Sequence, residues 1–196
     1  MFPALFANNE YLIDEKVQFL TFANNYKLYD NQGTQIGQIK QKLTTGKKIL
    51  QLFLSKAMLP FTLEIQDIDE KCVAQVSRGW TFWMSKIKIT DSEGIVIGYI
   101  KQKFAFLKPT FKIFNANQEE IGQIAGDWKA WNFTIKNATG ESIGTINKKW
   151  AGAVKEIFTT ADKYYVSIDP SYNEDLNKVI ILSTAITIDM VLKESK

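Results

Sequence analysis

The chain has 196 residues, of which 45% are hydrophobic and 23% are charged, and its net charge is +3. That length can bury a full core in one domain, and we treat residues 1–196 as a single domain. The charge is too small to indicate nucleic-acid binding. The sequence contains no histidine and one cysteine, Cys72, so neither a Ser-His-Asp site, a Cys-His site nor an internal disulfide can be built from it. We therefore expect no enzymatic site and no cofactor.

In chain order, residues 11–22 predict a strand pair, or a strand with a short turn. A repeated unit then begins, in which an alternating strand, a polar turn and a second strand with Ile-Gly-x-Ile follow one another. The copies are 26–33 with 36–39, 86–94 with 97–100, 111–115 with 121–124, and 133–137 with 143–146. A degenerate copy runs through 61–67 and 72–76, residues 48–54 predict a further strand, and 164–168 predict the last one.

Strict alternation bounded by turn residues is the pattern of a β-hairpin. Hairpins at such short, regular spacing predict an antiparallel meander that closes on itself. The fold class we expect is mainly β, a closed antiparallel barrel of about twelve strands. The glycine inside each second strand predicts a bend, or a close approach of another element to the sheet, such as a helix against the inner wall.

The end of the chain predicts a helix over residues 174–192. From Val179 to Ile188 there is no charge, and apolar side chains point all round the helical wheel, which is typical of a helix buried on every side. Ser171 with Glu174 forms a predicted capping box, and Asp175 would lie in the first turn. A membrane-spanning helix is the alternative, but Lys178 and Asp189 leave only ten uncharged residues between them, so we favour burial.

Together, the Ile-Gly-x-Ile hairpins, the segment Lys148-Lys149-Trp150-Ala151-Gly152, the run from Thr160 to Tyr164 and the apolar helix resemble the phospholipid scramblase family. The resemblance covers the chain from about Tyr11 to Leu192. It implies the barrel shared with the tubby C-terminal domain and the LURP-one-related proteins, twelve strands threaded by a C-terminal helix. It also implies calcium-triggered phospholipid scrambling.

Calcium is the cofactor that the resemblance would bring, and its proposed segment corresponds to residues 160–171. A loop of the EF-hand type needs oxygen ligands at fixed positions. Of the residues at those positions only Asp162 is a good ligand, so the match is poor. Asp162 and Asp169 are predicted instead to be turn and cap residues.

Four lysines that follow the Gly-x-Ile segments are the candidate lipid-binding residues: Lys101, Lys103, Lys148 and Lys149. Their strands would be four apart and would run the same way, so both pairs reach one rim of the barrel. Lys40 and Lys42 are predicted at the other rim. Trp80 and Trp83, with Phe82 between them, are candidate anchors in a membrane interface. The alternatives are a solvated barrel exterior for the lysines and core packing for the tryptophans.

Three functions are considered, and the third, an enzyme, is disfavoured because the sequence has no histidine and no nucleophile–base pair. The first is a module that contacts a membrane surface, with anionic phospholipids as partners. The second is a cytosolic protein-interaction or structural module on the same fold. Residues 1–9 have neither a basic region nor a long apolar run, so we expect a cytoplasmic protein, in peripheral contact with the membrane under the first function. We expect neither a nucleic-acid partner nor a transmembrane span.

Overall fold

The computed structural model describes residues 4–16, 25–42, 59–80, 86–103, 110–127, 129–148, 163–172 and 175–194. A 3₁₀ helix, η1 (Ala4–Ala7), precedes the sheet, and α2 (Asp175–Glu194) ends the chain. The strands are β1 (Glu10–Lys16), β2 (Asn25–Tyr29), β3 (Gln35–Gln41), β4 (Phe61–Asp67), β5 (Cys72–Arg78), β6 (Lys86–Asp91), β7 (Val96–Lys103), β8 (Thr110–Asn115), β9 (Glu120–Asp127), β10 (Asn132–Asn137), β11 (Ser142–Asn147) and β12 (Lys163–Ile168).

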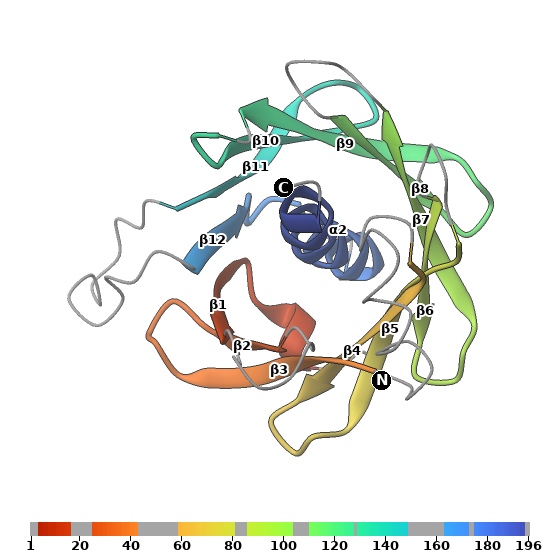
Figure 1. The fold of residues 1–196 in the computed structure, drawn as a ribbon. Coiled ribbons are helices and arrows are strands. Elements are labelled where there is room, and N and C mark those ends of the chain that lie inside the picture. Colours follow the sequence, from red (N-terminus) through yellow and green to blue (C-terminus); the bar gives the residue numbers. More distant parts are fainter. Residues whose placement is uncertain are drawn as a thin grey trace.

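The twelve strands form one closed antiparallel barrel around α2 (Figure 1). Each strand pairs with its chain neighbours, and β1 pairs with β12 to complete the ring. The predicted architecture is thus confirmed. The predicted strand over 48–54 and the second part of the predicted pair over 11–22 lie outside the described residues. The ring closes with β3 directly against β4, where Gly37 faces Asp67.

One turn design connects the strands of each of the five hairpins. The first turn residue is Asp or Asn, and its Oδ1 accepts the backbone N–H of the residue four positions later at 2.8–3.0 Å. The fourth residue has positive φ and is glycine in three of the turns. These first residues are Asp30, Asp67, Asp91, Asn115 and Asn137. Because side-chain capping fixes the turn, it also fixes the strand register.

Each hairpin also carries a register shift at the same place, opposite or just beside the repeated glycine (Ala74 in the degenerate copy). Such bulges bend a strand and raise its twist, which helps a sheet to curve into a barrel. At Gly98 the predicted close approach of the helix is confirmed, since an added Cβ would lie 2.6 Å from Ile180 Cδ1 and 2.7 Å from the Phe114 carbonyl oxygen. At Gly144 the atom closest to an added Cβ is instead a carbonyl oxygen of the neighbouring strand.

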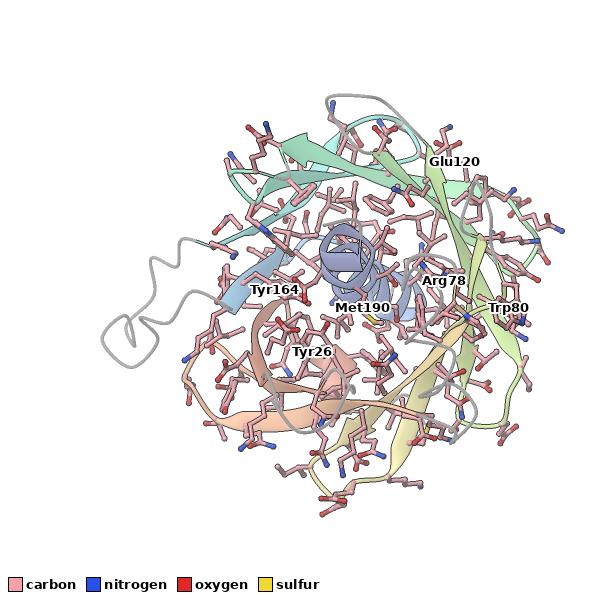
Figure 2. The ribbon with its side chains drawn as sticks, viewed as in Figure 1. Tyr26, Arg78, Trp80, Glu120, Tyr164 and Met190 are labelled. Carbon is pink, nitrogen blue, oxygen red and sulfur yellow. The ribbon has the colours of Figure 1, made fainter. Side chains whose placement is uncertain are left out.

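The barrel interior is occupied by α2 and the inward side chains. In Figure 2, Tyr26 and Tyr164 lie inside the wall, whereas Trp80 and Glu120 lie on its outer side. Two of the three buried hydroxyls on α2 are satisfied within the helix, because Thr184 and Thr187 donate to the carbonyl oxygens of Ile180 and Ser183 at 2.7 and 2.8 Å, whereas the Ser183 hydroxyl makes no hydrogen bond. The predicted burial of this segment is confirmed. No helix among the described residues is both long and apolar enough to cross a bilayer.

The predicted start of the helix needs one correction. Asp175 lies in the first turn, as expected. Ser171 does not cap the helix, because α2 begins four residues later and the Ser171 hydroxyl donates to Asp169 Oδ1 at 2.7 Å. A tight turn after β12 therefore takes up Ser171, and Glu174 lies outside the described residues.

Replacing Ala185 by Arg should prevent soluble folding. Ala185 is fully buried, with 0% of its surface exposed. A charge buried there without a partner costs several kcal/mol, comparable with the whole free energy of unfolding, about 5–15 kcal/mol. Leu176→Arg is the matched control, because Leu176 is 45% exposed on the same helix. Soluble yield and thermal unfolding measure the effect, and an Ala185→Arg protein that melts like the wild type would contradict the buried position of α2.

Replacing Gly98 by Ala should lower the free energy of unfolding by about 1–3 kcal/mol, the usual cost of overpacking a tight site. The new methyl group would press on the backbone of β8, which cannot move aside as a side chain can. Gly79→Ala is the control, since an added Cβ there meets no atom within 4 Å. Urea unfolding of the two variants measures this difference. Equal midpoint concentrations of urea would show that the backbone of β7 can shift to accommodate the methyl group.

Candidate functional site

The barrel has two chemically different ends, which follow from the strand directions. All five tight hairpin turns lie at one end, together with the turn at 169–172 that leads into α2; we call this end the hairpin rim. β1 and the second strand of each hairpin run from the hairpin rim to the opposite end. Residues that follow β5, β7, β9 and β11 therefore gather at that opposite end, whatever their separation in sequence.

The hairpin rim is acidic. Its turn segments, 30–34, 67–71, 91–95, 115–119, 137–141 and 169–172, contain one base, Lys71. Their acids are Asp30, Asp67, Asp69, Glu70, Asp91, Glu93, Glu119, Glu141 and Asp169. Several of these carboxylates accept backbone N–H groups of their own turn, so they are explained by local structure.

The opposite end is basic, and we call it the basic rim. The described bases at or near strand ends there are Lys16, Lys27, Lys40, Lys42, Arg78, Lys86, Lys101, Lys103, Lys129, Lys148 and Lys163. The corresponding acids are Asp14, Glu15, Glu64 and Asp127. Arg78 points inward: its guanidinium donates to the Leu59 carbonyl oxygen at 2.8 Å and lies 4.7 Å from the Phe61 ring centroid. The low net charge of the chain therefore conceals two ends of opposite sign.

Four of the six predicted site residues fall in the described chain, and all four belong to the basic rim. The Lys101 amine lies 4.3 Å from the Phe114 ring centroid, and the Lys148 amine lies 5.1 Å from that of Trp131. Lys103 ends β7, and Trp80 follows β5 with 55% of its surface exposed. Lys149 and Trp83 lie outside the described residues. The rim shared by Lys101, Lys103 and Lys148 is thus as predicted, and Trp80 joins it.

The predicted position of Lys40 and Lys42 is wrong. β3 and β7 are four strands apart and run the same way, so these lysines lie toward the basic rim as well. The sequence prediction counted a strand over 48–54, and the barrel closes without it. Both amines are ion-paired, Lys40 with Glu70 at 3.0 Å and Lys42 with Glu64 at 2.6 Å. These contacts lower the pKa of Glu70 and raise that of Lys42.

A group of lysines on the outer wall was missed in the sequence. Lys86, Lys101 and Lys112 lie directly opposite one another on β6, β7 and β8. The next row on this outer face contains Lys88, Tyr99 and Phe114, which also face one another. Strand alternation gives the face of each residue, and the turn at 91–95 gives the register of β6 on β7. Those two signals could have found Lys86 and Lys88.

The described residues of the segment 160–171 do not form the calcium site that the family resemblance implies. Asp169 Oδ1 accepts both the backbone N–H and the hydroxyl of Ser171, at 2.8 and 2.7 Å, and these bonds lower the Asp169 pKa. Asp162 lies outside the described residues. No group of three or more His, Cys, Asp and Glu side chains is placed to hold a metal ion within the described ranges. Burial raises the pKa of the Cys72 thiol, which suits a packing role better than a reactive one.

The fold defines a helix-threaded β-barrel with two rims of opposite charge. The model of the Scramblase family matches residues 12–195, and the chain belongs to this family. Phospholipid scramblase family member 5 of Homo sapiens is 31% identical over 93 residues, which are 44% of this chain and 34% of that protein. Phospholipid scramblase 1 of Mus musculus is 26% identical over 152 residues, 70% of this chain and 46% of that protein.

The fold has a solved counterpart in a protein from Arabidopsis thaliana. The two structures superpose with a TM-score of 0.57, covering 97% of this chain and 98% of that one, at 9% sequence identity. That likeness supports the architecture alone. The chain spans about a third to a half of the two scramblases named above, so the activities of those whole proteins do not follow from the match.

Proposed function

We propose that this protein contacts anionic phospholipid surfaces through its basic rim, as a peripheral module without an enzymatic site. The observation that carries the proposal is the separation of charge along the barrel, with bases at one rim and acids at the other. Membership of a family whose named relatives are phospholipid scramblases supports phospholipid as the partner.

The rim has two features that suit a membrane interface. Each lysine near an anionic bilayer surface contributes about 1 kcal/mol of attraction, and this attraction declines within a Debye length of about 8 Å at physiological ionic strength. The exposed Trp80 offers an amphipathic ring of the kind enriched at the level of lipid head groups. Binding of this type is reversible and sensitive to salt.

Changing Lys101, Lys103 and Lys148 to Gln should weaken binding to vesicles of phosphatidylserine and phosphatidylcholine by roughly 100-fold, from about 1 kcal/mol per lysine. Raising the salt concentration should weaken wild-type binding in the same direction. Co-sedimentation over a series of phosphatidylserine fractions measures both effects.

The control variant changes Lys71 and Lys136 to Gln, which removes positive charge in and beside the turns of the hairpin rim. It should bind far more like the wild type. Wild-type protein that fails to bind anionic vesicles would exclude the proposal and favour the protein-interaction module. Binding that survives both high salt and the rim variant would indicate insertion of apolar side chains instead.

We further propose that the protein does not scramble phospholipids in response to calcium. A head group needs a polar path across about 30 Å of hydrocarbon. Here α2 and the inward side chains occupy the barrel interior, and the carboxylate of Asp169 is engaged by its own turn. The barrel wall already removes the apolar surface of α2 from water, so entering the bilayer would bury no additional apolar surface of this helix.

Proteoliposomes with a fluorescent lipid in both leaflets test this second proposal. Dithionite added outside should bleach only the outer leaflet, to the same extent with calcium and with a chelator. Protein-free vesicles and vesicles opened with detergent set the two limits. Rapid, calcium-dependent loss of the inner-leaflet signal from intact vesicles would show that α2 can leave the barrel and enter the bilayer.

A further inference from the structure

Three lysines of the described chain that make no salt bridge lie close together on one part of the outer wall. Among the described residues, Lys86, Lys88 and Lys101 make no salt bridge, whereas Lys40, Lys42 and Lys163 do. Lys112, in the same wall, is paired with Glu120. We propose that the outer wall of β6–β8 is the surface that faces an anionic phospholipid bilayer, with the hairpin rim turned away. This inference rests on the proposed function and adds the docking face and the orientation.

The wall is built as two rows across three neighbouring strands. The first row is Lys86, Lys101 and Lys112, and the second is Lys88, Tyr99 and Phe114. Directly opposite side chains have Cβ atoms about 4.5–5.5 Å apart, so the six side chains form one compact basic and aromatic patch. Lys86 and Lys88 are exposed, and Lys101, Tyr99 and Phe114 are half-buried.

Folding does not require this arrangement. Like charges directly opposite one another on neighbouring strands destabilise a sheet. The structure reduces the cost by placing the Lys86 amine 4.4 Å from the Tyr99 ring centroid and the Lys101 amine 4.3 Å from that of Phe114. Cation–π contacts at exposed sites are weak. Lys112 is already paired with Glu120, and an anionic surface would neutralise Lys86 and Lys101 as well, so charge complementarity points to such a partner.

Two other features orient the barrel on that surface. Trp80 follows β5, at the same end as the start of β6, so an exposed indole ring lies at the basic end of the sheet next to this wall. The acids of the hairpin rim would be repelled by a bilayer of the same sign. The bilayer should therefore touch the part of the β6–β8 wall that lies next to the basic rim, and the turn at 91–95 should lie farther from the bilayer.

Single labelling sites can test this orientation in the full-length chain. Cys72 is the only cysteine, so Cys72→Ser gives a background without thiols. New cysteines at Ser77, Asn25 and Ser92 then mark three regions, since Ser77 faces Lys88, Asn25 lies at the basic rim on β2, and Ser92 lies in a hairpin turn. Each variant carries one fluorophore, and vesicles of phosphatidylserine and phosphatidylcholine contain a quencher attached to lipid.

We expect quenching several-fold stronger at Ser77 than at Asn25, and none above background at Ser92. The triple variant Lys86→Gln, Lys88→Gln and Lys101→Gln should bind roughly 100-fold more weakly, from about 1 kcal/mol per lysine. The control variant at Lys71 and Lys136 should bind like the wild type.

The outcomes separate this inference from the proposed function. Binding with equal quenching at Ser77 and Asn25 would show docking by the whole rim, and binding with strongest quenching at Ser92 would show the opposite orientation. Either result overturns the docking face and leaves the proposed function standing. Unchanged affinity of the triple variant also overturns it. Absence of binding to anionic vesicles overturns both.

Discussion

The constraint on which the structure depends is the helix α2, which is mostly apolar and is buried on every side. A sheet that covers one side of such a helix would leave the other in water, and at about 25 cal/mol per Å² the exposed remainder would be costly. A closed wall covers all sides at once, and β1 pairing with β12 provides that closure. Because α2 and the inward side chains occupy the space inside the wall, the chemistry of the protein has to be sought on its outer face and at its two rims.

Closure in turn depends on a device repeated in all five hairpins. The Asp or Asn side chain at the start of each turn fixes the register, and the shift opposite or beside the repeated glycine bends the pair. At Gly98 the missing side chain admits both Ile180 of the helix and the carbonyl oxygen of Phe114. The turn acids that serve this local purpose also give the hairpin rim its negative charge. The electrostatic polarity of the barrel is thus partly a consequence of how its hairpins are made.

Much of the fold was predictable, because hairpins and a helix that is apolar all round are local patterns. The prediction that depended on counting strands was weaker. The prediction counted a strand at 48–54 and therefore placed Lys40 and Lys42 at the wrong rim. In an antiparallel meander, one additional strand reverses the direction of the chain relative to every later strand. Ser171 and Glu174 resembled a capping box because the same residue types serve turns and helix starts. Predicting the row of Lys86, Lys101 and Lys112 also requires the register between β7 and β8. These two strands belong to different hairpins, so no tight turn fixes their register, and it is known only from the closed barrel.

The family and the surface carry different kinds of information. The Scramblase family model covers the barrel, and a plant protein only 9% identical shares the architecture, so very different sequences can form this fold. The inward residues are constrained by packing around α2, whereas the outward residues are constrained only by solubility and by partners. Lys86, Lys101 and Lys112 lie side by side on adjacent strands, and only Lys112 has an ion-pair partner, Glu120. The charges of Lys86 and Lys101 are compensated only by contacts with aromatic rings. An arrangement that packing does not require is best explained by what it binds, and adjacent positive charges beside two aromatic rings match a surface of phosphate groups.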